Sequence, residues 1–265
     1  ARARLPAPSG GGSGCAALWS DTAWRWLAED FEATSEGSRL EEACLLLRHD
    51  DAAAAPARAS SFLARARLVP SVATCRGELS LVFAELRLVR AALAAGCDVV
   101  MLLSGSCLPL VRLGELLGYM SRQAAAGRSV LFYSFMKGGQ QRLLGVPYGA
   151  LQWKIWHRRQ AEVLASLTDD ELAARWSLLQ PVMSKYNLAP DEVVLANELH
   201  ERAGPLDACC ERLAVTYNEW EARGSADSGP RRARVFTEVP PAAWERRAQA
   251  AAAGRECPLL CRKEA

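Results

Sequence analysis

The chain has 265 residues, half of them hydrophobic, which is enough to bury a sizeable core in one large domain or two small ones. Its formal net charge of +2 at pH 7 argues against a protein whose main partner is nucleic acid. The nine cysteines include no CxxC pair and no Cys/His spacing of the zinc type. Their odd number leaves at least one thiol free or bonded to another chain, and a secretory-pathway location with some disulfide bonds stays open.

The amino-terminal segment, residues 1–14, is rich in Gly, Pro and Ser and has little to bury. We expect it to be a disordered tail in front of a single domain that spans residues 15–265. A helix is expected over residues 18–31, with its tryptophans in the core. No signal peptide or membrane span is visible, and because the chain begins without a Met, an anchoring segment can precede it.

A short strand is expected at residues 43–47, and two aspartates, Asp50 and Asp51, follow it. Two carboxylates at a strand end can hold a divalent cation beside a diphosphate. A solvated turn explains the same pair, and we favour that interpretation over a metal site. Residues 69–73 predict a further edge strand.

The most regular pattern is a helix, a buried strand, a small-residue loop and a second helix. Apolar residues at steps of three and four predict the first helix over residues 79–93, and Gly96 ends it in the left-handed conformation. Residues 99–103 form a continuous apolar run, which predicts a central strand buried on both faces. The charged residues of the helix are expected on its solvent side: Glu78, Glu85, Arg87 and Arg90.

Small residues, Ser104-Gly105-Ser106, follow this strand, and the second amphipathic helix runs through residues 113–120. This order of elements predicts an α/β fold with a central sheet flanked by helices. Ligands of such folds bind at the carboxyl ends of the strands. We therefore expect a ligand beside Ser104 and Ser106.

The next two elements are predicted from β-rich composition and from aromatic spacing. Residues 129–135 predict a sheet strand, followed by a polar loop over residues 137–142. Residues 152–160 predict the start of a helix, in which Trp153 and Trp156 pack inward and the basic side chains are solvated.

Helix signals return in the last hundred residues. Thr168 and Glu171 form the capping box of a helix expected over residues 169–179. Pro190-Asp191-Glu192 begins the next helix, because Pro suits a first turn and acids complement the positive end of the helix dipole. Further along, we expect a strand at 213–217, a basic cluster at 231–234 and a helix at 240–253.

Common catalytic motifs are missing from the sequence. It has no P-loop, no dinucleotide-binding glycine motif, no GxSxG and no HExxH. The three histidines, His49, His157 and His200, do not assemble with a nucleophile into the set that a hydrolase needs.

Several stretches nevertheless resemble the core-2/I-branching glycosyltransferase family, which also includes peptide xylosyltransferases. The most specific stretch is residues 100–110, which is close to the family's LLSxSCxPL motif. The resemblance covers roughly residues 40–263. The other stretches are residues 76–82, Gln152-Trp153 with Arg158 and Ala161, Pro190-Asp191-Glu192, residues 215–220 and residues 259–263.

The resemblance implies an inverting transferase with a fold like glycosyltransferase type A, which has a Rossmann-like central sheet. Such an enzyme moves N-acetylglucosamine, xylose or glucuronic acid from a UDP-sugar to a hydroxyl of a glycan or glycoprotein. The family is typically held in the Golgi lumen by a type II membrane anchor. Its members work without the Asp-x-Asp metal motif, and Ser104-Gly105-Ser106 stands where that motif is expected. We therefore expect no metal and no cofactor beyond the donor.

The resemblance also assigns the residues of catalysis and donor binding. Glu192 matches the glutamate that acts as the base in the family. Lys263, with Arg262 beside it, matches a basic residue that neutralises the leaving diphosphate, and Arg232 is a further candidate. Ser104 and Ser106 are expected on the donor side.

Acceptor contacts are expected from aromatic residues. Trp220 matches an aromatic residue near the acceptor sugar, and Gln152 and Trp153 match a motif close to the site. The chain departs from the family at Arg76, at Ala150-Leu151 and in the missing first strand before Trp19. These departures leave a second hypothesis open, a non-catalytic relative that binds glycans or scaffolds other enzymes.

Overall fold

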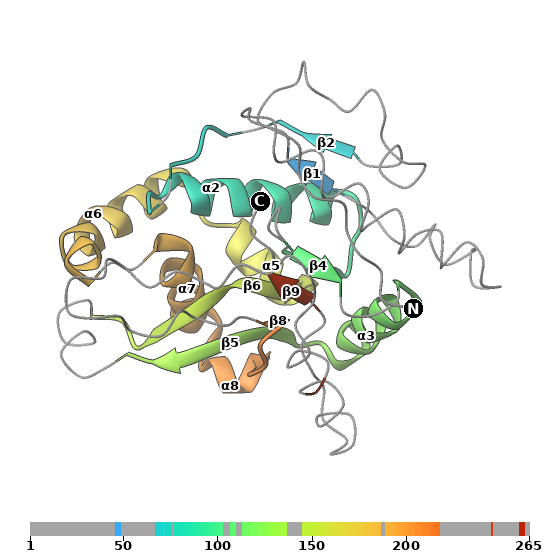
Figure 1. Cartoon of the computed structure of the whole chain (residues 1–265). Coiled ribbons are helices and arrows are strands. Elements are labelled where there is room, and N and C mark those ends of the chain that lie inside the picture. Colours follow the sequence, from blue (N-terminus) through green and yellow to red (C-terminus); the bar gives the residue numbers. More distant parts are fainter. Residues whose placement is uncertain are drawn as a thin grey trace, which may run out of the picture.

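The structure of the protein is a computed structural model with a mixed α/β fold (Figure 1). It describes residues 46–48, 67–70, 72–75, 77–102, 107–109, 113–136, 145–186, 189–217, 245 and 260–262. Several expectations lie outside these residues: the tail at 1–14, the helix at 18–31, the helix at 240–253 apart from Glu245, the Asp50-Asp51 pair, the loop at 137–142 and the basic cluster at 231–234.

A four-stranded mixed sheet positions most of the described chain. Its order is β3 (Val99–Met101), β6 (Tyr148–His157), β5 (Ser129–Phe135) and β7 (Cys210–Glu211). Strand β6 is antiparallel to both of its neighbours, whereas β5 and β7 are parallel. The strand predicted at 129–135 is thus confirmed with its bounds.

The expectation that residues 99–103 form a central strand is wrong. Within the described residues, β3 is three residues long and pairs only with β6, so it stands at one end of the sheet. Val100 is buried, but Val99 and Met101 are only partly buried. The apolar run instead reflects the burial of Val100 on one face of β3 and of Leu102, which follows the strand. Leu102 donates its backbone N–H to the Lys154 carbonyl at 2.9 Å.

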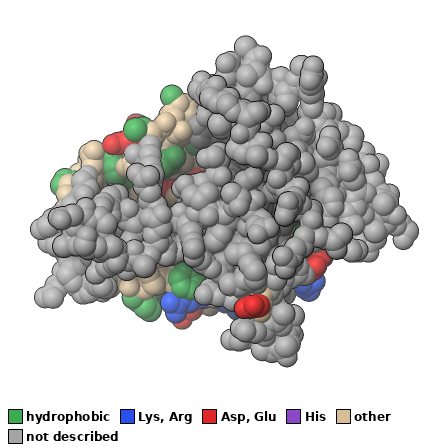
Figure 2. Space-filling view, in the orientation of Figure 1, with side chains coloured by type: hydrophobic (Ala, Val, Ile, Leu, Met, Phe, Trp, Pro, Cys, Tyr) green, Lys and Arg blue, Asp and Glu red, His purple; other side chains and the backbone are tan. Residues whose placement is uncertain are grey.

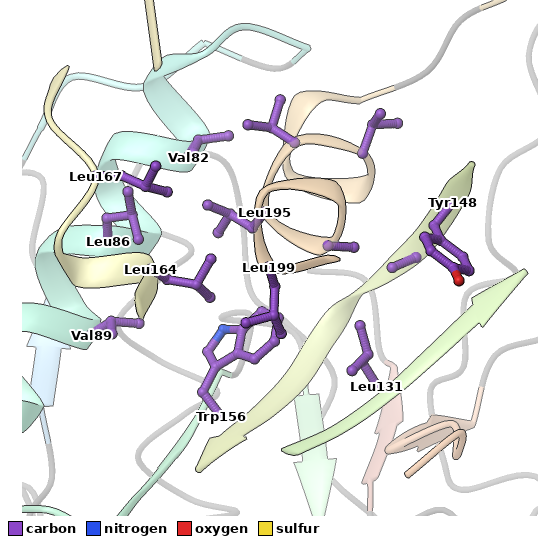
Figure 3. Close-up of a cluster of buried hydrophobic side chains, with 14 of the residues drawn as sticks. Val82, Leu86, Val89, Leu131, Tyr148, Trp156, Leu164, Leu167, Leu195 and Leu199 are labelled. Atoms are coloured by element: carbon purple, nitrogen blue, oxygen red, sulfur yellow. The ribbon is translucent and has the colours of Figure 1, made fainter. Parts of the chain in front are cut away.

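Helices α2 (Ser80–Ala94), α5 (Arg158–Ala165) and α7 (Val194–Ala203) cover one face of this sheet and close the hydrophobic core (Figure 1). Trp156 of β6, Leu164 of α5 and Leu199 of α7 point toward one another and are completely buried (Figure 3). Burying such side chains stabilises the fold by about 1.5–3 kcal/mol each. Further side chains from α2 complete this part of the core: Val82, Leu86 and Val89.

The predicted helix over residues 152–160 is also wrong in its first half. Residues Tyr148–His157 form β6, and helix α5 begins only at Arg158, where the His157 imidazole accepts a hydrogen bond from the Arg159 backbone N–H. Two neighbouring strands offer hydrogen-bond partners to this aromatic-rich segment, and this tertiary pairing outweighs local helix signals. Trp153 and Trp156 do pack inward, as expected.

Two smaller sheets join segments that are distant in the chain. Strands β1 (Leu46–Arg48) and β2 (Arg67–Val69) are parallel. Strand β9 (Leu260–Arg262) lies between β4 (Cys107–Pro109) and β8 (Thr216–Tyr217), antiparallel to β4 and parallel to β8.

The remaining elements are α3 (Leu113–Ala126), α6 (Asp169–Tyr186), the 3-10 turn η4 (Pro190–Glu192) and α8 (Leu206–Cys209). The capping box of α6 is confirmed, because the Thr168 hydroxyl accepts from the Glu171 N–H and Glu171 accepts from the Thr168 N–H at 2.7 Å. Gly96 follows α2 with a φ of 87°, as expected for a left-handed helix end. None of the described helices has the length and apolarity needed to cross a bilayer.

Candidate functional site

The turn that carries Glu192 lies between α6 and α7 and is fixed by its own backbone. The N–H groups of Glu192 and Val193 donate to the carbonyls of Ala189 and Pro190, both at 3.1 Å. Asp191 is buried, whereas Glu192 is only partly buried. The turn therefore buries one carboxylate and leaves the next one partly accessible.

Asn197 anchors the helix that follows this turn. Its side-chain oxygen accepts from the Tyr148 N–H at 3.1 Å, and its amide nitrogen donates to the Tyr148 carbonyl at 2.8 Å. The same nitrogen donates to the Val193 carbonyl at 2.6 Å. One buried amide thus joins the start of α7 to the first residue of β6.

A buried ion pair between β6 and α2 contacts the η4 turn. Lys154 of β6 is completely buried, and its Nζ lies 3.2 Å from Oε2 of Glu85 on α2. Lys154 Nζ also donates to the Asp191 carbonyl at 2.7 Å. Trp156 Nε1 donates to Glu85 Oε1 at 3.1 Å. Three elements, α2, β6 and η4, therefore meet at one ammonium group.

The charges in this cluster are unevenly balanced. Burial raises the pKa of the Glu85 carboxyl, the Lys154 ammonium opposes the rise, and the negative charge of Asp191 adds to it. Oδ1 of Asp191 is buried and has no hydrogen-bond partner among the described residues. Lys154 pairs with the Glu85 carboxylate, whereas its contact with Asp191 is to the main-chain carbonyl.

The expectation that Glu85 lies on the solvent side of α2 is therefore wrong, and so is the expectation that Lys154 is solvated. The Glu85 side chain is only 10% exposed because Lys154 and Trp156 face it from β6. Glu78 and Arg87 are exposed, as expected. Sequence reasoning missed the pair, although one signal was available: Lys154 stands between Trp153 and Ile155 in an apolar stretch.

Gln152 and Trp153 lie at an irregularity of β6. The register pairs Leu131 with Lys154 and then Tyr133 with Ala150, so Phe132 alone stands opposite residues 151–153. Such bulges redirect side chains and are common beside active sites. Gln152 is partly exposed and Trp153 is buried at 3% exposure. Their contact with an acceptor stays a prediction.

The sheet β4–β9–β8 brings together three stretches that resemble the family. Cys107 is in register with Arg262, and Tyr217 is in register with Cys261. Strands β8 and β9 are parallel, and β4 is antiparallel to β9. The last residues of β8 and β9 and the first residue of β4 therefore lie at the same end of this sheet. Most of the expected donor and acceptor contacts follow β8 or β9, or precede β4, in the sequence.

Most of those residues themselves lie outside the described part of the chain: Ser104, Ser106, Trp220, Arg232 and Lys263. Arg262 is described as the last residue of β9. The structure thus describes Glu192, Gln152, Trp153 and the backbone of Arg262, and it places Arg262 beside the start of the Cys107 strand. No group of three or more His, Cys, Asp or Glu side chains within the described ranges is arranged to hold a metal ion.

Surface charge in the view of Figure 2 is mixed. Acidic and basic side chains of described residues lie close to one another along the lower edge of the molecule in that view. On this face, the described residues therefore form no extended basic surface of the kind that binds nucleic acid.

Part of the chain matches a known protein family. The Core-2/I-Branching enzyme model matches residues 47–139, a stretch from β1 to just past β5 that includes Ser104 and Ser106 and ends before Glu192. No curated protein matches the chain. Residues 47–139 are thus similar to the Core-2/I-Branching enzyme family, as the motifs indicated, and that family is one of glycosyltransferases.

Proposed function

We propose that the protein is an inverting glycosyltransferase that moves a sugar from a UDP-sugar to a hydroxyl of a glycan or glycoprotein. The observation that carries the proposal is the sheet β4–β9–β8, which joins the motif around Cys107 to Arg262 and to Tyr217, all in stretches that resemble the family. The family match over residues 47–139 supplies the reaction class.

In the proposed reaction, the acceptor hydroxyl attacks the anomeric carbon of the donor sugar from the face opposite the diphosphate. The new C–O bond forms while the bond from that carbon to the UDP oxygen breaks. Glu192 accepts the hydroxyl proton, which is the role of a general base in a single displacement. Its partial exposure, next to a buried Asp191, fits a carboxylate that must meet a substrate.

The leaving UDP carries the negative charge that develops in this step. Fixed cationic side chains stabilise such charge electrostatically. We assign this task to Lys263 and Arg262, with Arg232 as a further contact and with Ser104 and Ser106 as hydrogen-bond donors. This part of the proposal makes transfer independent of a metal ion.

The rest of the proposal follows the family resemblance. The donor sugar is N-acetylglucosamine, xylose or glucuronic acid, and Trp220 stacks on the acceptor sugar near Gln152 and Trp153. The fold is that of glycosyltransferase type A, and the mixed sheet with helices on one face is compatible with it. The proposed location is the Golgi lumen, with a type II membrane anchor.

The test is calorimetric titration of the purified chain with UDP, with and without EDTA, followed by a panel of UDP-sugars. We expect binding that the chelator does not change, and release of UDP from one sugar of the panel when a glycan acceptor is present. Binding of glycans without any binding of millimolar UDP would replace the proposal by the non-catalytic, glycan-binding alternative.

A further inference from the structure

Lys154 is the most completely buried charged side chain in the described core. Its exposure is 0%, and its Nζ lies beside Glu85 of α2, the Asp191 carbonyl of η4 and the ring of Trp156, whose centroid is 5.8 Å away. Placing an ammonium in such surroundings costs free energy unless hydrogen bonds and an opposite charge offset it. An apolar side chain of similar length would fill the same space. The positive charge of Lys154 therefore has to be explained by the groups that its Nζ contacts.

Lys154 holds the turn that carries Glu192. Its Nζ donates to the carbonyl of Asp191 at 2.7 Å, which is the peptide unit immediately before Glu192. On the other side, the Asn197 amide donates to the carbonyl of Val193 at 2.6 Å, the residue immediately after Glu192. The backbone is thus tied down on both sides of Glu192, once from β6 and once from α7.

Glu85 and Trp156 hold the lysine in turn. Glu85 contacts Lys154 Nζ with both carboxylate oxygens, at 3.3 and 3.2 Å, and accepts from Trp156 Nε1 at 3.1 Å. Because Trp156 is fully buried between the sheet and the helices, the carboxylate has little freedom to move. The chain of contacts therefore runs from the core through Glu85 and Lys154 to the peptide bond beside Glu192.

We propose that Lys154 is a positioning residue, which with its counter-ion Glu85 fixes the Pro190–Glu192 turn so that the Glu192 carboxylate points at the acceptor hydroxyl. This inference rests on the proposed function, in which Glu192 is the base. Lys154 touches no reacting atom and acts only through the Asp191 carbonyl. Misplacement of a catalytic group by about 1 Å can lower a rate by roughly 100-fold, so a small shift of the turn is enough to matter.

The test compares the double variant Glu85→Gln/Lys154→Met with Ser129→Ala. The double variant removes the ammonium without leaving the buried Glu85 carboxylate unpaired, because the side-chain amide introduced by Glu85→Gln carries no charge and can still accept from Trp156. The control Ser129 also makes buried hydrogen bonds, to Gln160 and from the His157 N–H, but it does not contact the turn. The Ser129→Ala variant therefore shows how a general loss of stability alone affects hydrogen exchange and turnover.

Two measurements are made on each variant. The first is hydrogen exchange of the peptide that covers residues 189–193, which needs no substrate. The second is kcat and KM with the UDP-sugar that the wild type uses, together with calorimetric UDP binding. For the double variant we expect faster exchange confined to the turn and a kcat about 10- to 100-fold lower, with KM for the donor and UDP affinity within about twofold.

Unchanged exchange in the turn, or a kcat like that of Ser129→Ala, would overturn the positioning role. A wild type that shows no transfer with any UDP-sugar would instead remove the proposed function, and the exchange data would still decide whether Lys154 holds the turn. Should the double variant fail to fold, Trp156→Phe replaces it. That variant removes the hydrogen bond to Glu85 together with part of the buried indole ring, so it is compared with Ser129→Ala for general loss of stability. We expect faster exchange confined to the turn, at smaller amplitude.

Discussion

The two sheets that carry the candidate site are built in different ways. The sheet β3–β6–β5–β7 is covered by three helices and supplies the buried core, and side chains of β6 and α7 hold the Glu192 turn. The sheet β4–β9–β8 consists of two- and three-residue strands from distant parts of the chain. The proposed base thus depends on the packed core, whereas the proposed diphosphate contacts depend on backbone pairing of short strands.

This difference separates two kinds of functional defect. A change in the first sheet should alter the chemical step and the stability together, because the same side chains serve both. A change among the expected donor contacts that follow the second sheet in the sequence should alter donor binding more than stability, because the proposal gives these residues a role toward the donor and none in the core.

The largest effect is expected for Glu192→Gln. The amide cannot accept the hydroxyl proton, so transfer should fall by roughly 100- to 10,000-fold while UDP affinity stays close to that of the wild type. Kinetics with the identified UDP-sugar and calorimetry with UDP measure the two quantities. The matched control is Glu162→Gln, which makes the same chemical change on an exposed residue of α5. A Glu192→Gln enzyme with wild-type turnover removes Glu192 as the base.

The core of the first sheet is tested by Leu164→Ala. Leu164 is completely buried beside Trp156, and replacing such a leucine leaves a cavity that costs about 2–5 kcal/mol of unfolding free energy. Urea unfolding measures the change. Leu178→Ala is the control, because Leu178 is 75% exposed and its truncation should stay within about 0.5 kcal/mol. Equal effects of the two changes would contradict the assigned core.

The second sheet is tested by Lys263→Ala, one residue beyond β9. Losing a cation that contacts the diphosphate should weaken UDP binding by about 10- to 100-fold, which corresponds to the loss of about one charge-assisted hydrogen bond. The urea midpoint should not move. Arg159→Ala is the control, because Arg159 is an exposed cation in the first turn of α5. Equal loss of UDP affinity in both variants would point to net charge instead of a specific contact.

Local patterns predicted much of the first sheet and its helices. The apolar spacing of α2, the β-rich segment of β5 and the Thr168–Glu171 cap each depend on residues close together in the chain, and all three are found in the structure. The place of β3 and the strand character of Gln152–Trp153 depended on the pairing of β6 with β3 and β5, two segments that lie earlier in the chain. No local pattern contains that information.

The candidate site was predicted less completely, because some of its residues are defined by partners on other elements. Glu192 stood out through the family resemblance and through its place in a helix-start signal. Lys154 and Glu85 did not, because charged residues on helices are usually solvated and their partner lies on another element. The bond from Lys154 to the Asp191 carbonyl involves a main-chain atom, which leaves no trace in the sequence.

The smallest effect is expected from replacing Glu171, an exposed residue of α6 that belongs to neither sheet and tests surface electrostatics alone. Hydrogen bonds from the Thr168 backbone N–H, from Arg202 and from the Thr168 hydroxyl lower the pKa of the Glu171 carboxyl to about 2, from a usual value of 4.5. Because the folded-state pKa lies below the unfolded one, the stabilisation is complete above about pH 4.5 and is lost as the pH falls toward 2. Glu171→Gln should therefore flatten the acid limb of a plot of urea midpoint against pH. UDP binding at pH 7 should not change, because Glu171 lies at the exposed start of α6 and contacts neither Lys154 nor the Pro190–Glu192 turn. An acid limb that keeps its slope in this variant would assign the acid sensitivity to other carboxylates.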